Sequence, residues 1–368
     1  MSISPRSLPA AAAAKWKFAA ISCGRDHTVA LLDSGAVFGW GGEGSGRMPS
    51  GTPDYCSTPS ARTNATEVAV GTRIAALAAG YGVSLAITDE GRLSIWGANA
   101  GGLAGRLDAI RPASPQLLPS VTDVRMAAAG EFQYAAIDAE GRLLTWGLNM
   151  EGALGRPVRQ HNDGPGYVDG IGTVAQVAVG RGHMLAIDSA GLLHGWGGNG
   201  AGQLGLGTLA SAASPQSIGA GRRRFIRIAA GATHSLALST AGKVYAWGSN
   251  HHGQLGDRAP VYASAPRPVR LPEPITAIEA GMHFSVALGE SGTVYTWGWN
   301  GHGQLGAGAT GERHRPTAVK YLAKATAIAA GEAHVVALTP AGLYGWGSNA
   351  NGQLGMSERR QRTAALFF

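Results

Sequence analysis

Two glycines eleven residues apart, followed by a tryptophan, recur seven times along this chain and restrict its fold more than any other feature. The tryptophan lies five residues after the second glycine in six copies and four residues after it in the last. A fixed period of about 50 residues indicates a repeat architecture, in which each unit is stabilised by stacking on its neighbours. The glycine pairs are Gly24 and Gly35, Gly80 and Gly91, Gly130 and Gly141, Gly180 and Gly191, Gly231 and Gly242, Gly281 and Gly292, and Gly331 and Gly342.

Each copy predicts four short strands, because its apolar segments are brief, rich in Val, Ile, Leu, Tyr and Trp, and bounded by turn residues. In the fifth copy we expect a first strand within 225–231, a second at 234–239, a third at 243–248 and a looser fourth after the loop "SNHHGQLG". The first strands are rich in alanine, which suits the crowded axis of a radial array. The sequence therefore predicts an all-β fold, a seven-bladed β-propeller of four-stranded antiparallel blades.

The turn residues are interpreted as parts of this fold. We expect Gly231, Gly242 and Gly281 to reverse the chain tightly with φ above zero, where a Cβ atom is costly. An asparagine follows most of the repeat tryptophans and is expected to close its own turn through its side-chain amide. These asparagines are Asn99, Asn149, Asn199, Asn250, Asn300 and Asn349.

The segment "GATHSLALSTAGKVYAWGSNHHGQLG", residues 231–256, resembles the repeat of the regulator of chromosome condensation family. The resemblance runs through seven copies, over roughly residues 17–355, and implies a seven-bladed propeller. It leaves function open, because the family includes exchange factors for a nuclear GTPase, ultraviolet photoreceptors, protein inhibitors and uncharacterised bacterial proteins. The motif "GWRHT" of the photoreceptors is absent from this sequence, which argues against that branch.

We expect one propeller domain over residues 17–368, after a disordered lead-in at 1–16. The lead-in lacks the apolar core of a secretory signal, and no apolar run is long enough for a membrane span, so we expect a cytoplasmic monomer, with export by another route as the alternative. Cys23 and Cys56 form no disulfide framework, and the Ala, Gly and Arg bias suggests a bacterial source. The repeats are expected to start near Lys17, Thr72, Thr122, Thr173, Arg224, Pro274 and Lys324.

The net charge of +7 includes two arginine clusters, at 222–227 and 359–362. We interpret them as a solvated loop and a frayed end, with an acidic or phosphate-rich partner as the alternative. Exposed aromatic residues are not interleaved with either cluster, so the sequence favours a protein partner over a nucleic acid.

No catalytic constellation or cofactor motif is apparent in the sequence. His27, His183, His234 and His334 share one repeat position and are expected to pack and bond within their own blades. One histidine cluster leaves a metal site as a minor alternative, although no carboxylate accompanies it at matching positions. Its members are His251, His252, His283 and His302.

Strand alternation places the turns between first and second strands on the same face as the loops after the "WG" pairs. Residue types vary at these places while the opposite turns repeat, so this face is predicted to bind a partner. Trp299 is the main candidate anchor, unless it lies down over a neighbouring blade. The predicted partner-binding residues are Arg25, Asp26, Tyr81, Glu131, Phe132, Met150, Arg181, His251, His252, Met282, His283, Trp299, His302 and Glu332.

The function predicted from these observations is a non-catalytic protein-binding scaffold without a cofactor. The first alternative, implied by the family resemblance, is a guanine-nucleotide exchange factor for a small GTPase. The second is an enzyme with a histidine-lined site at the channel mouth.

Overall fold

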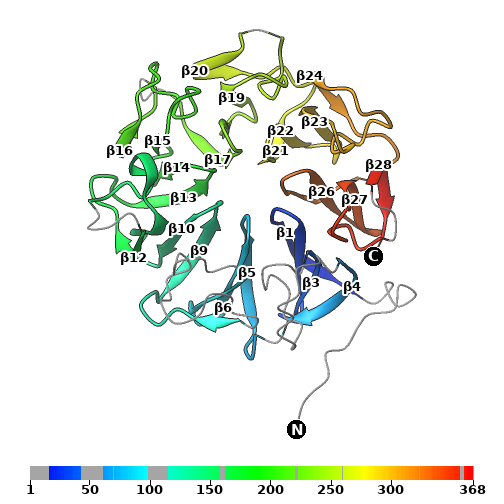
Figure 1. Ribbon diagram of the computed structural model, residues 1–368, viewed down its shortest axis with the longest axis horizontal. Helices are drawn as coiled ribbons and strands as arrows, with labels where there is room; N and C mark the ends of the chain where they lie inside the picture. Colours follow the sequence, from blue (N-terminus) through cyan, green and yellow to red (C-terminus); the bar gives the residue numbers. More distant parts are fainter. Residues whose placement is uncertain are drawn as a thin grey trace.

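The computed structural model describes residues 16–42, 61–68, 70–97, 115–157, 162–219, 223–258, 260–322, 324–356 and 360–367. Within these ranges, seven four-stranded antiparallel sheets stand around a common axis, which confirms the predicted seven-bladed propeller (Figure 1). Each sheet uses four strands that are consecutive in the chain. Residues 1–15, Cys56, Asn99, Arg222 and Arg359 lie outside the described residues.

The strands take the same order in every blade, from the axis outwards. The innermost are β1 (Phe18–Cys23), β5 (Ile74–Ala79), β9 (Val124–Ala129), β13 (Val174–Val179), β17 (Phe225–Ala230), β21 (Ile275–Ala280) and β25 (Ala327–Ala330). The second strands are β2 (His27–Leu32), β6 (Val83–Thr88), β10 (Gln133–Asp138), β14 (His183–Asp188), β18 (His234–Ser239), β22 (Phe284–Gly289) and β26 (His334–Thr339). The third strands are β3 (Val37–Gly42), β7 (Leu93–Gly97), β11 (Leu143–Leu148), β15 (Leu193–Gly197), β19 (Val244–Ser249), β23 (Val294–Gly298) and β27 (Gly342–Ser348). The outermost are β4 (Ala61–Val68), β8 (Gln116–Leu117), β12 (Asn162–Tyr167), β16 (Ala212–Ser217), β20 (Tyr262–Pro268), β24 (Arg313–Ala318) and β28 (Arg360–Leu366).

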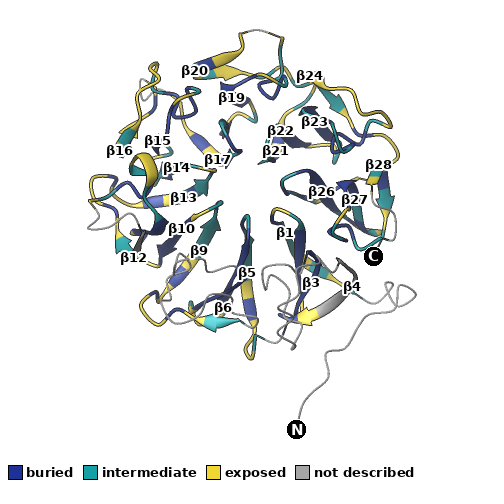
Figure 2. Cartoon of the chain, viewed as in Figure 1, coloured by how far each residue is buried: buried dark blue, intermediate teal, exposed yellow. Residues whose placement is uncertain are grey.

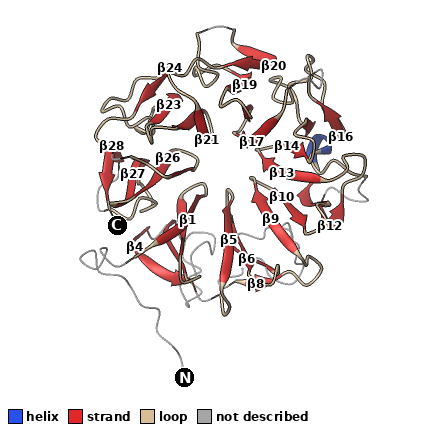
Figure 3. Cartoon of the chain, turned by 180° about the vertical axis from the view of Figure 1, so that it is seen from behind, coloured by secondary structure: helices blue, strands red, loops and turns tan. Residues whose placement is uncertain are grey.

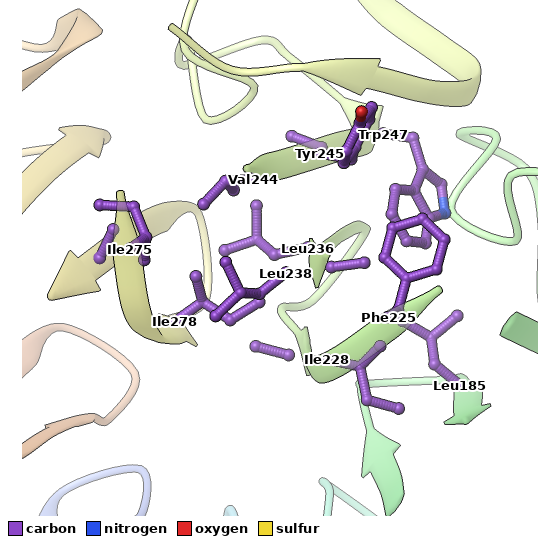
Figure 4. Close-up of a cluster of buried hydrophobic side chains, with 14 of the residues drawn as sticks. Leu185, Phe225, Ile228, Leu236, Leu238, Val244, Tyr245, Trp247, Ile275 and Ile278 are labelled. Atoms are coloured by element: carbon purple, nitrogen blue, oxygen red, sulfur yellow. The ribbon is translucent and has the colours of Figure 1, made fainter. Parts of the chain in front are cut away.

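The hydrophobic core lies between neighbouring blades, because each blade packs both of its faces. Strands β2, β6, β10, β18 and β22 are buried at every residue, and exposed residues gather on the outer strands and loops (Figure 2). In one cluster, Phe225 of the fifth blade lies beside Leu185 of the fourth, and Leu238 of the fifth lies beside Ile278 of the sixth (Figure 4). A blade without its neighbours would therefore expose apolar surface on both sides.

The repeat tryptophans also bond from blade to blade. Each is fully buried, and in five blades the described residues show its indole N–H donating to a backbone carbonyl in the loop of the preceding blade. The donor and acceptor residues are Trp40 and Gln353, Trp196 and Ala153, Trp247 and Gln203, Trp297 and Gln254, and Trp346 and Gln304, at 2.8–3.1 Å.

The repeat-position histidines cross the same junctions, which corrects the expectation that they bond within a blade. His183 Nε2 lies 3.0 Å from Ser235 Oγ of the next blade, and that hydroxyl donates to the carbonyl of Gln203 at 2.7 Å. Since a hydroxyl has one proton to donate, His183 Nε2 must be the donor to Ser235. His27, His234 and His334 face Ser84, Ser285 and Thr28 in the same way.

The ring closes without exchange of strands between the first and last blades. Blade 7 contains β25, β26, β27 and β28, and blade 1 contains β1, β2, β3 and β4. The junction is held by Thr28, which donates to the carbonyl of Gln353 at 2.8 Å, and by Trp40, which donates to the same carbonyl at 2.9 Å. The closing contact therefore repeats those at two other junctions, where Ser235 with Trp247 and Ser285 with Trp297 each share one carbonyl.

The expected positive φ holds for Gly242, at 71°, and is wrong for Gly231 and Gly281, which are not in the left-handed region. These two glycines are required by close approach instead. A Cβ at Gly231 would meet the ring of His234, and a Cβ at Gly281 would meet the ring of Phe284. At each of these glycines the backbone passes close to the aromatic side chain that begins the second strand of the same blade, and only a hydrogen atom fits between them.

The loop asparagines were expected to close short turns, but they span longer ones. Asn250 Oδ1 accepts from the backbone N–H of Leu255, five residues on, at 2.9 Å, and its amide donates to the carbonyl of Pro260 at 2.8 Å. Asn199, Asn300 and Asn349 make the corresponding bond to Leu204, Leu305 and Leu354. These side chains hold the shape of the loops that follow the third strands.

The described part of the chain holds no helix of a length and apolarity that would cross a membrane. Among the described residues, one short 3-10 helix, η3 (Met150–Gly152), lies between β11 and β12 and is blue in the view from behind (Figure 3).

Candidate partner-binding face

The turns between first and second strands form a ring around the axis, and among the described residues backbone hydrogen bonds link neighbouring turns at five of the seven junctions. Tyr81 N–H donates to the carbonyl of Gly130 in the next blade at 2.9 Å, and Ala232 N–H donates to that of Met282 at 3.1 Å. Glu332 N–H closes the ring by donating to the carbonyl of Gly24 at 3.3 Å. We call this ring, together with the loops after the third strands, the tip face.

One arc of the tip face joins charged and aromatic side chains from four neighbouring turns. Arg25 Nε lies 3.1 Å from Glu332 Oε2, and the Arg25 guanidinium stacks over the Tyr81 ring at 4.4 Å. Tyr81 in turn faces Phe132, with ring centroids 6.5 Å apart. Burial raises the pKa values of Tyr81 and Glu332, and Arg25 opposes both shifts. The structure therefore brings these four predicted residues together.

A second ion pair follows around the ring. Arg181 Nε lies 2.6 Å from Glu131 Oε2, and Glu131 belongs to the same turn as Phe132. Both positive charges of the arc thus have a carboxylate partner, which leaves the exposed Phe132 ring as its prominent apolar group.

The other side of the tip face carries an aromatic cluster around Trp299. Its ring lies 5.2 Å from that of His302, 6.2 Å from that of His283 and 6.3 Å from that of His252. His252 belongs to the loop of the preceding blade and also bonds to Glu312, with Nδ1 2.5 Å from Oε1. Burial lowers the pKa values of His283 and His302, which favours their neutral forms.

Trp299 is half-buried and lies over Gly301 of its own loop, where a Cβ would meet the indole ring at 2.9 Å. It therefore rests partly against the protein, in line with the alternative weighed from sequence. Part of its ring remains exposed beside the three histidines.

The remaining predicted residues are placed less centrally. Met150 is 57% exposed on η3, while His251 is exposed and makes none of the ring contacts of the Trp299 cluster among the described residues. Asp26 accepts from Asn351 Nδ2 across the ring junction at 3.2 Å, and Met282 lines the axial cavity.

The geometry gives no support to a metal site or to the histidine-lined enzyme. In the described ranges, no group of three His, Cys, Asp or Glu side chains could hold a metal ion. His252 is engaged by Glu312, and its ring faces His283 at 5.2 Å with a tilt of 40°. The cluster has the character of a packed aromatic patch.

Sequence reasoning missed Glu279, which lies inside the axial cavity rather than on its rim. This cavity, of about 330 Å³, is lined by the innermost strands and the tip turns. Burial raises the pKa of Glu279 to about 8. The signal was present in the sequence, because the residue two places before the first glycine is small in the other six copies: Ser22, Ala78, Ala128, Ala178, Ala229 and Ala329.

Comparison with known proteins gives a consistent picture of the fold. The profile of the RCC1-like domain matches residues 102–365, and that of the regulator of chromosome condensation (RCC1) repeat matches residues 18–47. The chain is 35% identical over 113 residues to the Ultraviolet-B receptor UVR8 of Arabidopsis thaliana, a match that covers 30% of this chain and 25% of that receptor. The chain spans a quarter or less of the length of the curated relatives it matches.

Two solved structures share the whole architecture. Human WBSCR16 superposes with a TM-score of 0.79 at 24% identity, covering 90% of this chain and 94% of that chain. Prp20p from Saccharomyces cerevisiae, described with its binding properties to Gsp1p and histones, gives a TM-score of 0.72 at 23% identity, covering 85% and 80%. At these identities the likeness concerns the fold.

Proposed function

The chain belongs to the RCC1-like domain family, and from that premise we propose that it is a non-catalytic scaffold that binds a protein through its tip face. Family members bind other proteins, and the propeller supplies a rigid ring on which loops of different composition are displayed. Among the described residues, Arg25 and Arg181 of the tip turns are paired with Glu332 and Glu131. Affinity would therefore come mainly from exposed aromatic and apolar groups.

The observation that carries this proposal is the convergence of Trp299, His252, His283 and His302 from two blades into one partly exposed patch. Aromatic side chains held by their neighbours lose little entropy on binding, and such residues dominate the energetics of interfaces. Phe132, at 37% exposure, supplies a second anchor across the ring. A partner that spans both patches would cover the mouth of the axial cavity.

Site-specific photocrosslinking tests the choice of face. A photoreactive phenylalanine analogue is placed at Phe132, at Met150 or, as a control on the opposite turns, at Glu290, and the protein is exposed to extract of its native cells. We expect the same crosslinked protein from Phe132 and Met150 and none from Glu290. Crosslinks from Glu290 alone would assign binding to the opposite face.

The exchange-factor alternative is supported by the fold shared with Prp20p and by family members that bind small GTPases. It is tested by release of a fluorescent guanine nucleotide from small GTPases of the native host. If substoichiometric amounts of this protein accelerate nucleotide release, the protein is an exchange factor and the scaffold proposal is wrong.

A further inference from the structure

The axial cavity contains an ionisable side chain that the fold does not require. Glu279 stands on β21, is half-buried and lines the cavity, and alanine fills the equivalent position in five of the other blades. All seven innermost strands contribute to the cavity wall. A carboxyl group among alanine methyl groups is costly to desolvate, so a structural role is a poor explanation for its presence.

Glu279 has no cationic partner among the residues described. The positive groups that line the cavity, Arg25 and Arg181, are at its mouth and are paired with Glu332 and Glu131. The other ionisable group of the inner wall is Cys23, and burial raises the pKa of its thiol to about 12, so it stays neutral. The inner cavity therefore offers one carboxyl group and no protein charge to balance it.

The other residues of the cavity wall indicate which kind of cation would fit. It consists largely of alanine side chains and glycine backbone, such as Ala78, Ala128 and Ala178. A divalent metal would need several oxygen ligands, and no described cluster offers them. A volume of about 330 Å³ is at the lower end of the range for small-molecule sites, which suits a short aliphatic stem.

We propose that the axial cavity binds an alkylammonium group, a primary ammonium on a short aliphatic stem, with Glu279 as its counter-ion and the alanine methyl groups around the stem. The ammonium group supplies the positive charge that Glu279 lacks within the cavity. Binding lowers the pKa of Glu279 because it favours the ionised carboxylate. This inference depends on the cavity and is independent of partner binding at the tip face.

Calorimetric titration of the full chain with n-butylammonium tests the proposal. Binding requires the ionised carboxyl, and the free carboxyl titrates with a pKa of about 8. We therefore expect the association constant to rise roughly tenfold per pH unit from pH 6 to near pH 8 and then to level off. The variants Glu279→Gln and Glu279→Ala should each lower it at least tenfold at pH 9.

Matched controls separate the charge from the stem and from the fold. Glu290→Gln removes an exposed carboxylate from the same blade and should bind like the unmodified chain. n-Butanol carries the same stem without the charge, and its weak binding should not respond to Glu279→Gln. Thermal melts establish that the variants are folded, and Glu279→Ala places the residue of five other blades at this position. Absence of binding by the unmodified protein, or equal binding by Glu279→Gln, would overturn the proposal.

Discussion

The indole N–H of Trp40 donates to the backbone carbonyl of Gln353, 2.9 Å away, across the junction between the first and seventh blades. The same carbonyl accepts from the Thr28 hydroxyl at 2.8 Å. Trp247 and Ser235 share the carbonyl of Gln203 in the same manner, at 2.8 and 2.7 Å. The closing junction of the ring is thus built like an interior one.

This equivalence predicts that Trp40→Phe and Trp247→Phe destabilise the protein alike. Each removes one buried hydrogen bond and part of a ring, which should lower the free energy of unfolding by about 1–3 kcal/mol. Chemical denaturation followed by circular dichroism measures both. A large loss for Trp247→Phe beside none for Trp40→Phe would show that the ring opens at its closing junction before it unfolds.

The two tryptophans of the sixth blade should separate stability from binding. Trp297 is fully buried, and Trp297→Ala should cost roughly 3–5 kcal/mol of stability through the cavity it leaves. Trp299→Ala should leave the melting temperature nearly unchanged and weaken partner binding by about 2 kcal/mol, roughly 30-fold. Binding is measured by titration with the partner that photocrosslinking identifies. Unchanged affinity of Trp299→Ala would show that Trp299 is not part of the interface.

Alanine substitutions at Gly281 and Gly242 should both destabilise the protein, but for different physical reasons. Gly281→Ala places a Cβ against the Phe284 ring, at a cost of about 1–3 kcal/mol for overpacking. Phe284→Val, the residue type that Val83 supplies in the second blade, should recover part of that loss. Gly242→Ala is strained by its φ of 71° and should lose at least about 1 kcal/mol. Its Cβ would also lie 2.9 Å from that of Pro274, so a smaller residue there should restore only the steric part of the loss. Thermal melts of Gly281→Ala, of Gly281→Ala with Phe284→Val, and of Gly242→Ala test these expectations. If Phe284→Val does not raise the melting temperature of Gly281→Ala, the clash with the Phe284 ring is not the cause.

The junction histidines predict loss of stability in acid. Burial lowers the pKa of His183 to about 4 and those of His234 and His334 to about 3, from an ordinary value of 6.5. Below pH 6.5 the unfolded chain binds protons that the folded protein excludes, so stability falls between pH 6.5 and about 4, by up to about 1.4 kcal/mol per pH unit for each histidine.

His234→Gln tests this acid dependence, because Gln133 occupies the same position in the third blade. The free energy of unfolding, measured by denaturant titration from pH 7 to pH 4.5, should decline less steeply in the variant. An unchanged slope would assign the acid sensitivity to other groups.

Glu279 predicts the opposite dependence. Its pKa rises from 4.5 to about 8 on folding, so its contribution to stability is full below pH 4.5 and is lost as the pH rises toward 8. At pH 7 the loss is at most roughly 3 kcal/mol, since Glu279 is only partly buried and solvent screens its charge. Glu279→Ala should therefore be more stable than the unmodified chain at pH 8 and equal to it at pH 4. Equal stability at both pH values would show that the carboxyl is freely hydrated.

The architecture could be predicted from sequence because the spacing of Gly231, Gly242 and Trp247 recurs in seven copies, and the alanine-rich first strands suit the crowded axis of a radial array. The partners of these residues could not be predicted, since they depend on how far apart adjacent blades stand. His183 was placed in its own blade for that reason, whereas its ring reaches Ser235 of the next. A repeat pattern also directs attention to variable loops, so Glu279, the one acidic residue at a position of small side chains, was passed over in the inner strand.

At three junctions a tryptophan and a hydroxyl of one blade share a backbone carbonyl of the preceding blade: Trp40 with Thr28, Trp247 with Ser235, and Trp297 with Ser285. The donors come from one blade and the acceptor from a loop of its neighbour. At these three junctions the hydroxyl also meets a repeat-position histidine of the preceding blade. Blades that lack this histidine, at Val83, Gln133 and Phe284, precede blades with Tyr134, Met184 and Val335 in the hydroxyl position, so the two sides of each junction are matched. A circular permutant whose chain is opened between the third and fourth blades and rejoined at the present ends would keep the same kinds of junction. A duplicated blade therefore forms a complete junction only where its histidine and hydroxyl positions match those of its new neighbours, and the angle needed to complete a circle limits how many blades the ring admits.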